Sequence, residues 1–203
     1  MLSSQRAMGL LYLALFTACV PAANWLIQNI GTLCLPQANG GTLCLIPVMP
    51  PPLAALFGAK PGEWLMAPSA VLVVGLAFVL RDLLQRRLGL LPATGAILLG
   101  AALSSLLAPP ELVIASGVAF LLAELADLLV YTPLQRNRLV LAVFASSIVG
   151  LVVDSVLFLQ LAFGSLDFLW GQVIGKSWMV LAALPVIWLI RQRELRLGWE
   201  PAR

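Results

Sequence analysis

Residues 139–163 read LVLAVFASSIVGLVVDSVLFLQLAF, a run that contains a single charged side chain, Asp154. A transmembrane helix needs about 17–25 predominantly apolar residues, so this run is long enough to cross a bilayer. An ionisable side chain at membrane depth is costly unless it is paired, hydrated or turned toward a cavity. The stretch therefore predicts a membrane helix and marks Asp154 as a candidate functional residue.

The rest of the chain has the same character. Its 203 residues are 61% hydrophobic and 10% charged, with a mean hydropathy of +1.00, whereas an ordinary soluble domain is about half apolar. We expect an all-α polytopic membrane protein in which residues 1–203 form a single integral membrane domain. Six transmembrane helices fit the apolar runs, at about 8–29, 64–80, 91–108, 112–131, 139–163 and 169–190.

Arginines gather on one side of these predicted spans. The other side would hold Lys60, Glu63, Glu111 and Asp167. Cytoplasmic loops of membrane proteins carry an excess of lysine and arginine, so we expect both termini in the cytoplasm. The arginines on that side are Arg6, Arg81, Arg86, Arg87, Arg136, Arg138, Arg191, Arg193, Arg196 and Arg203.

Composition also excludes several kinds of site. The chain has no histidine, the commonest metal ligand and the usual acid–base group near neutral pH. Its three cysteines, Cys19, Cys34 and Cys44, lack the spacing of a metal site. We expect no metal and no cofactor. The excess of arginine on the predicted cytoplasmic side accounts for most of the positive residues, so the net charge of +3 does not indicate a nucleic-acid partner.

The segment 30–63, between the first two predicted spans, differs from the others. The tetrapeptide Gly-Thr-Leu-Cys ends at Cys34 and again at Cys44, with Asn39-Gly40 between the two copies. Two such arms around an Asn-Gly turn predict a small hairpin on the outer face. The two cysteines either form a disulfide, if that side is oxidising, or are small apolar residues in a loop.

A proline-rich stretch, residues 45–58, follows this hairpin. Proline removes backbone donors and breaks helices, so the stretch is too short and too interrupted to span a bilayer. It can lie at the interface or re-enter the membrane against protein or water, and the sequence leaves both open.

Glu124 and Asp127 lie three residues apart in the predicted helix 112–131, so they share one of its faces. Two carboxylates this close in a dry site do not both ionise readily, so one of them can exchange a proton with a ligand or a gradient. The alternative is that they cap the cytoplasmic end of the helix. Glu124 is the stronger candidate, since it lies about 10 Å deeper than the boundary near Tyr131.

Asp154 and Lys176 form the second candidate pair. Asp154 lies about 22 Å above the start of its span, and Lys176 lies near the same depth in the next span, which descends from the outer side. Consecutive helices joined by the short link 164–168 should be antiparallel neighbours, so we expect a buried ion pair. That pair is either a static brace or a contact that substrate breaks or bridges during gating.

Two further motifs bear on a ligand site. Asn24 stands beside Trp25 in the outer half of the first span, and an amide with an aromatic ring suits a flat, hydrogen-bonding ligand; equally, Trp25 can belong to an interfacial belt. Residues 171–177, GQVIGKS, have three residues between the glycines where a nucleotide-binding loop has four, so nucleotide binding is rejected. The Gly171/Gly175 spacing instead favours a close helix–helix contact.

The order of several short blocks resembles the queuosine-precursor transporter family, also called the vitamin-uptake-transporter-like family. The resemblance covers roughly residues 20–30 and 64–178. Its blocks are Ala23–Leu26, Ala67–Ser69, Gly75–Asp82, Ala119–Asp127 with Val130-Tyr131, Ser146–Gly150, Asp154-Ser155, Leu157-Phe158, Leu161–Gly164 and Gly175-Lys176.

The resemblance implies six helices and the uptake of a purine-like base, such as 7-cyano- or 7-aminomethyl-7-deazaguanine, across a bacterial inner membrane. A carboxylate can accept the ring N–H and the adjacent NH₂ of a guanine-like edge, and Glu124 is the first choice for that role. Asp154 is the second choice, and Lys176 would hold it ionised or meet the carbonyl oxygen of the base. The remaining substrate-site candidates are Asn24, Asp127 and Phe158, the last as one of four rings available for stacking with Phe120, Phe163 and Trp178.

Arg81 and Asp82, at the inner end of the second predicted span, either gate the cytoplasmic exit or form a boundary ion pair. Because the chain has no ATP site, we expect a facilitator or a proton-linked carrier and no enzyme. The alternative is a substrate-binding membrane subunit that works with a separate ATPase module. Small residues four apart permit helix pairing between chains, so a homodimer is compatible with the sequence.

Overall fold

The computed structural model of the chain describes residues 2–36, 42–108 and 112–199. Most of these residues are helical. Along the chain the elements are α1 (Leu2–Asn29), β1 (Leu33–Pro36), β2 (Thr42–Met49), α2 (Pro51–Ala54), a 3₁₀ turn (Ala55–Phe57), β3 (Leu65–Pro68), α3 (Val71–Leu88), α4 (Leu90–Leu107), α5 (Val113–Leu134), α6 (Leu139–Phe163) and α7 (Leu169–Arg196).

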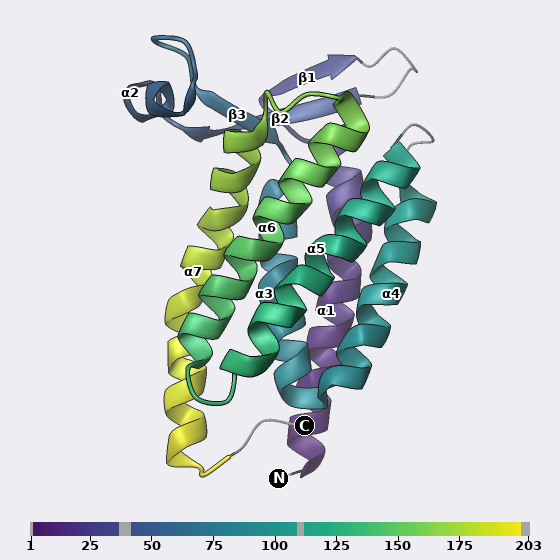
Figure 1. Ribbon diagram of the computed structural model, residues 1–203, viewed down its shortest axis with the longest axis vertical. Helices are drawn as coiled ribbons and strands as arrows, with labels where there is room; N and C mark the ends of the chain where they lie inside the picture. The colour runs from purple at the N-terminus through teal and green to yellow at the C-terminus, as the bar shows by residue number, and fades with distance from the viewer. Residues whose placement is uncertain (1, 37–41, 109–111, 200–203) are drawn as a thin grey trace.

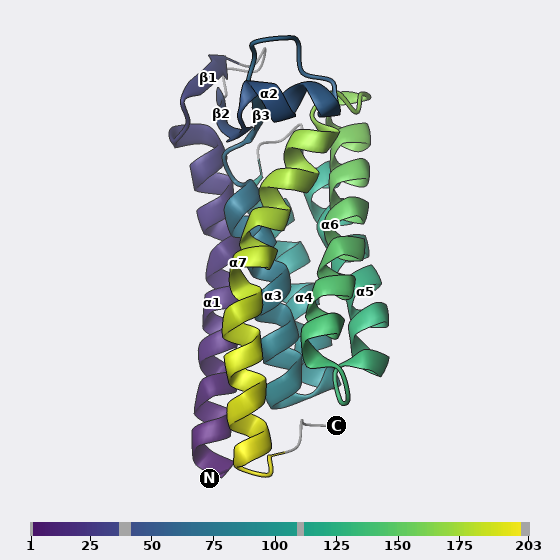
Figure 2. The same cartoon turned by 90° about the vertical axis from the view of Figure 1, so that its left-hand side faces the viewer.

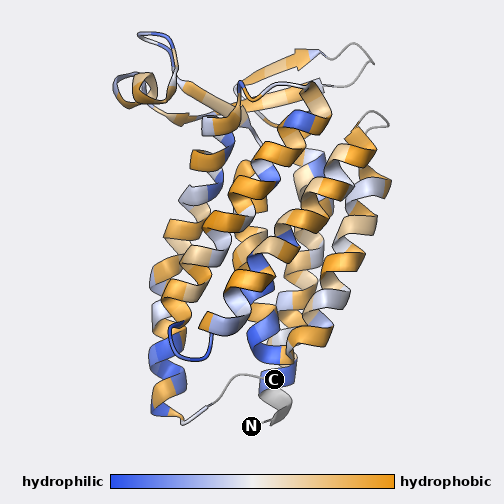
Figure 3. Ribbon diagram, viewed as in Figure 1, coloured by the Kyte–Doolittle hydropathy of each residue, from blue (hydrophilic) through white to orange (hydrophobic). Residues whose placement is uncertain are grey.

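The long helices α1 and α3 to α7 lie alongside one another as a bundle, with the small sheet and α2 at one end and both termini at the other (Figures 1 and 2). Large apolar side chains on the outside of the bundle are widely exposed, as at Leu91, Leu106 and Leu129. Figure 3 shows this apolar exterior, with hydrophilic stretches concentrated at the end that holds the termini. Such a surface suits lipid rather than water.

Five of the described helices, α1, α4, α5, α6 and α7, are long and apolar enough to cross a membrane. α3 is as long as α4 but carries four charged residues, Arg81, Asp82, Arg86 and Arg87. The molecule therefore has the arrangement of a multi-pass membrane protein, with one helix of comparable length that hydropathy alone does not select.

The second predicted span, 64–80, is wrong in its bounds. Its first residues form β3, which pairs antiparallel with β2, and the helix begins only at Val71 and continues to Leu88. The physical reason is that a buried strand and a buried helical turn are equally apolar, so hydropathy does not separate them. Arg81 and Asp82 consequently lie inside a helix and not at its end.

The sheet has the order β1-β2-β3 and is antiparallel throughout. The predicted hairpin is confirmed, and Cys34 pairs directly opposite Cys44, to which it is joined by a disulfide. Thus the disulfide is the alternative that the structure supports. The predicted Asn39-Gly40 turn lies outside the described residues, as do Glu111 and Arg203.

The proline-rich stretch begins in β2 and then forms α2 and the 3₁₀ turn beside the sheet (Figure 2). Proline at positions 51 and 52 starts α2, where its missing N–H costs nothing. The stretch therefore belongs to the sheet end of the molecule.

α3 occupies the middle of the bundle and packs against α1, α4, α5, α6 and α7. Its approach to α7 is close, because a side chain added at Gly75 would meet the backbone carbonyl of Lys176. Similarly, Gly150 of α6 leaves room for the ring of Phe78 and the Cβ of Asp127. These contacts bring polar residues of α3, α5, α6 and α7 together in the interior.

Candidate functional site

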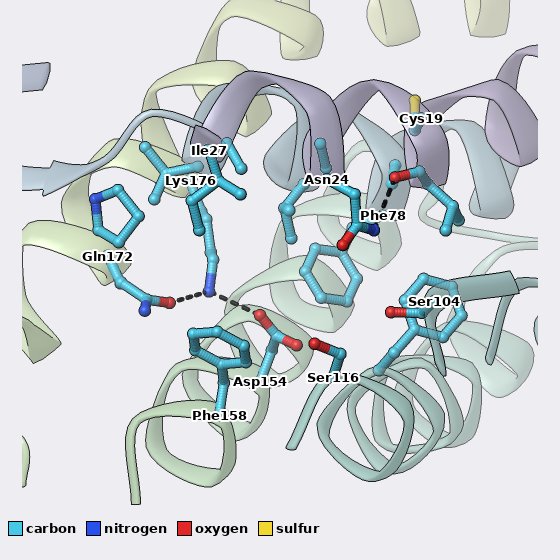
Figure 4. Close-up of a pocket in the computed structure, with 18 of the residues that line it drawn as sticks. Cys19, Asn24, Ile27, Phe78, Ser104, Ser116, Asp154, Phe158, Gln172 and Lys176 are labelled. Carbon is cyan, nitrogen blue, oxygen red and sulfur yellow. Dashed lines mark hydrogen bonds and ion pairs between the residues drawn. The ribbon is translucent and has the colours of Figure 1, made fainter. Parts of the chain in front are cut away.

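A pocket opens among the long helices (Figure 4). Pro68 of β3 and Ile27 near the end of α1 line it, so it lies in the half of the bundle nearer the sheet. Its cavity volume is about 120 Å³, which is smaller than the roughly 300–1,000 Å³ of typical small-molecule pockets. Its wall is mostly apolar. The polar or charged side chains in that wall are Asn24, Ser104, Ser116, Glu124, Asp154, Gln172 and Lys176.

Lys176 is the buried cation of the pocket, with only 2% of its side chain exposed. Its Nζ donates to Asp154 Oδ2 at 2.6 Å, to Gln172 Oε1 at 2.6 Å and to Ser155 Oγ at 2.8 Å. Figure 4 shows the ammonium group between Gln172 and Asp154, next to the ring of Phe158. The ion pair predicted between Asp154 and Lys176 is thus present, and its three bonds use the three donors that a lysine has.

Asp154 differs from Lys176 in exposure, since 15% of its side chain remains accessible. Only its Oδ2 bonds to Lys176, which leaves the pocket face of the carboxylate able to accept a donor from a ligand. A pair of this kind is stable because each charge has a partner, and it still presents one face to the cavity.

Arg81 is the centre of a second polar group, farther from the sheet than the pocket. Its Nε lies 3.1 Å from Glu124 Oε2, its Nη2 lies 2.8 Å from Asp127 Oδ1, and its Nη1 lies 2.9 Å from Asp82 Oδ1. We call these four residues the Arg81 cluster. All four side chains are buried, with at most 2% of their surface exposed.

Neutral side chains complete the surroundings of the Arg81 cluster. Gln85 Oε1 accepts from Arg81 Nη1 at 3.0 Å, and Ser146 Oγ donates to Asp82 Oδ2 at 3.0 Å. The ring of Tyr131 lies 5.6 Å from the guanidinium carbon, within the range of a cation–π contact. The side chains around this charge therefore come from three helices, α3, α5 and α6.

The eight predicted site residues divide into two neighbouring groups. Asn24, Glu124, Asp154, Phe158 and Lys176 line the pocket. The other three, Arg81, Asp82 and Asp127, lie in the Arg81 cluster, which meets the pocket through Glu124.

Two interpretations of these residues need correction. Asp127 does not cap a helix end, because α5 continues to Leu134 and the carboxylate is fully buried against Arg81. Arg81 and Asp82 do not form a boundary pair, because α3 continues for two further turns. Both corrections have one cause. Charged residues near the end of an apolar run were taken to mark the helix boundary, although their oppositely charged partners allow them to be buried within the bundle.

The aromatic candidates are not equivalent. Phe158 and Phe120 line the pocket together with Phe78. Phe163 instead packs edge-on against Phe158, with ring centroids 6.1 Å apart. Trp178 is about half exposed and donates to the backbone carbonyl of Val48 at 3.0 Å, so it is tied to β2. The pocket thus offers the rings of Phe78, Phe120 and Phe158 for stacking.

Asn24 donates through Nδ2 to the carbonyl of Val20 one turn earlier, at 3.0 Å. That bond orients the amide so that its carbonyl oxygen is the end turned away from its own helix, toward the cavity (Figure 4). Asn24 therefore lines the pocket, and its role in binding a ligand stays a prediction.

Sequence reasoning missed several polar neighbours. Gln172 precedes Lys176 by four residues and Gln85 follows Arg81 by four, so each glutamine lies on the same helical face as the charged residue to which it is hydrogen-bonded. This four-residue spacing could have identified both glutamines from the sequence. Tyr131 follows Asp127 by four residues and could have been found in the same way.

A third polar group lies at the end of the bundle that holds the termini. Glu194 of α7 accepts from Arg86 Nε at 3.1 and 3.0 Å and pairs with Arg87 Nη2 at 3.1 Å. Arg86 Nη1 also donates to the carbonyl of Gln135 at 2.7 Å, and the guanidinium of Arg87 lies 4.2 Å from the ring of Trp199. We call Arg86, Arg87 and Glu194 the Glu194 cluster; the two arginines are buried there, and not in a loop as expected.

Residues 106–190 match the sequence pattern of a family described as "Putative vitamin uptake transporter". No curated protein and no solved structure matches the chain. The matched region holds Glu124, Asp127, Asp154 and Lys176, whereas Arg81 precedes it. Over residues 106–190 the chain carries the pattern of the vitamin-uptake-transporter-like family, and its resemblance to that family is confirmed.

Proposed function

We propose that this protein takes up a queuosine precursor, a 7-deazaguanine base such as 7-cyano- or 7-aminomethyl-7-deazaguanine, across the bacterial inner membrane. Transport is facilitated or proton-linked. The matched family of transporters supports the general function, and the pocket supports the kind of substrate.

In this proposal α3 is a sixth crossing and both termini are cytoplasmic. Two observations support that orientation. Arg136, Arg138 and the arginines of the α7 end lie at the same end as the termini. The Cys34–Cys44 disulfide lies at the opposite end, which suits the oxidising outer side of a bacterial inner membrane.

The observation that carries the substrate proposal is the combination of groups around one cavity. Glu124 and Asp154 are acceptors, Lys176 is a donor, and Phe78, Phe120 and Phe158 supply flat apolar surface. A 7-deazaguanine presents donors along one edge, a carbonyl oxygen next to them and two π faces. Each feature has a counterpart in the pocket wall.

Glu124 is the acceptor that we assign to the donor edge of the base. Only its Oε2 is engaged by Arg81, so Oε1 is available to a ligand, whose donors favour the ionised carboxylate. An ionised acceptor makes hydrogen bonds about twice as strong as a neutral one, which favours the base over an apolar ring of the same size.

Thermal unfolding of the purified protein in detergent tests the assignment. A panel of 7-cyano-7-deazaguanine, 7-aminomethyl-7-deazaguanine, queuine, guanine, adenine and riboflavin is added at increasing concentration. A ligand at a hundred times its Kd stabilises the folded state by about 2.7 kcal/mol. For a chain of this size that corresponds to a rise in Tm of about 5–10 °C.

The variant Glu124→Ala should abolish the shift, because the donors of the base lose their acceptor. Asp167→Ala, which removes an exposed carboxylate from the α6–α7 link, is the matched control and should keep it. An unchanged shift in Glu124→Ala would remove Glu124 from the site, and a panel without any shift would remove deazaguanines from the proposal.

Uptake by proteoliposomes that contain only the purified chain tests transport separately from binding. Entry of the base without ATP and without another protein is the expected result. A protein that binds the base but moves none would instead be a substrate-binding subunit that needs an ATPase partner.

A further inference from the structure

The Arg81 cluster has more negative than positive groups. Asp82, Glu124 and Asp127 surround a single guanidinium, and all of them are buried. If every carboxylate were ionised, the cluster would hold two negative charges without a counter-charge. Uncompensated charge in a dry interior costs several kcal/mol per ion, so the cluster must take up protons or stay open to water.

Charged groups on the neighbouring helices do not supply the balance. Lys176 of α7 is already paired with Asp154 of α6, and α4 carries no ionisable side chain. Arg86 of α3 is bound to Glu194. Cys19 of α1, which faces Glu124, can add only negative charge.

A second observation points to a proton rather than to a metal ion. The hydroxyl of Tyr131 and Oδ2 of Asp127 are buried and have no hydrogen-bond partner among the described residues. An ionised carboxylate oxygen without a donor is among the costliest groups in a protein interior, whereas a carboxylic acid carries no charge there. The guanidinium at the centre of the cluster also repels a cation that would otherwise bind three carboxylates.

The cluster meets the pocket through one of its members. Glu124 lines the pocket and accepts a hydrogen bond from Arg81. Asp82 and Asp127 do not line the pocket and are connected to it only through Arg81 and Glu124. A ligand bound to Glu124 therefore acts on the charge balance of the two aspartates through the shared arginine.

We propose that the Arg81 cluster is a proton-binding site whose protons enter the cell together with the substrate. The substrate half of this statement rests on the function proposed above; the proton half does not. Substrate donors hold Glu124 ionised, and Arg81 neutralises that one carboxylate. Asp127 and Asp82 each hold a proton taken from the outer solution as carboxylic acids, before as well as after substrate binds, and release it to the cytoplasm when the substrate-bound protein opens at its inner end.

Infrared spectroscopy of the purified protein tests the proton site without any substrate. At neutral pH we expect a C=O stretching band of a buried carboxylic acid, which shifts in D₂O. Asp127→Asn and Asp82→Asn should each remove part of this band, and Asp167→Asn, at an exposed position, should leave it unchanged. A wild-type spectrum without the band, or a band that neither buried variant reduces, overturns the proposal.

Coupling is tested in proteoliposomes with a proton-sensitive dye inside and the membrane potential clamped at zero. With the lumen one pH unit more alkaline, wild-type protein should accumulate the base about tenfold per coupled proton and acidify the lumen. Asp127→Asn should lose accumulation while exchange of labelled base remains measurable. Base entry by wild type without proton entry overturns coupling but leaves the proposed substrate intact, whereas absence of any base transport contradicts the proposed function.

Discussion

Removing the charge of either Asp154 or Lys176 should destabilise the protein. Removing both charges should cost less stability than the sum of the two single changes. In Asp154→Asn the ammonium group of Lys176 keeps Gln172 and Ser155 but loses its counter-charge. In Lys176→Met the carboxylate of Asp154 loses its donor. The double variant buries no unpaired charge.

The structure sets the size of these effects. Stranding one member of a buried ion pair costs about 3–5 kcal/mol. Lys176 is 2% exposed, so Asp154→Asn should lie near the middle of that range. The 15% exposure of Asp154 allows partial hydration, so Lys176→Met should lie at the lower end, about 3 kcal/mol. For a chain of this length that is a drop in Tm of about 6–12 °C.

A thiol-reactive dye provides the assay, because Cys19 is buried and is the one cysteine outside the disulfide. Its fluorescence therefore reports unfolding around a single site in α1. Wild type, both single variants and the double variant are melted in the same detergent, and the coupling energy follows from the double-mutant cycle.

The expected coupling is about 2–3 kcal/mol, within the range measured for residues in direct contact. Two results contradict the reasoning. Additivity within about 0.5 kcal/mol would mean that the two charges do not stabilise each other. A Lys176→Met variant as stable as wild type would mean that Asp154 is hydrated well enough to need no partner.

Two further predictions concern the helix contacts. Glu194→Gln should destabilise the protein by about 3–5 kcal/mol, because two buried arginines lose their one carboxylate. The control Glu63→Gln, at an exposed position, should change the Tm little. Equal Tm values for the two variants would contradict a structural role for the Glu194 cluster. Gly75→Ala should cost about 1–3 kcal/mol, because the new Cβ meets the backbone of Lys176. Gly95→Ala, where nothing lies nearby, should be neutral or stabilising, and a tolerated Gly75→Ala would show that α3 and α7 can separate freely.

The apolar runs predicted most of the helices because a bilayer-length run has few alternatives. Asp154 and Lys176 could be paired from the sequence for a related reason: two spans joined by a short link fix the relative depth of their residues. Glu124 and Asp127 were placed on one face by helical spacing alone. These inferences depend only on local spacing and on the thickness of the membrane.

Hydropathy failed where long-range partners decide the structure. Arg81 was placed at the inner end of its predicted span and Arg86 beyond that span, because a charge normally ends an apolar run. In the structure Arg81 binds Glu124, 43 residues away, and Arg86 binds Glu194, 108 residues away. No local pattern contains these pairings. The strand β3 was missed for a similar reason, since its partner β2 lies across a segment without clear periodicity.

The sequence distance between α3 and its partners also constrains how the chain assembles. Glu124 and Glu194 are synthesised well after α3, so a growing chain carries Arg81 with only Asp82 as its carboxylate partner, and carries Arg86 before its carboxylate exists. Alone in lipid, α3 would expose these charges at a cost of about 2.5–3.5 kcal/mol each. If α3 crosses the membrane as proposed, its stable insertion must therefore wait for α5 and α7. In a nascent chain that stops before α7, α3 should remain at the membrane surface or bound to the insertion machinery.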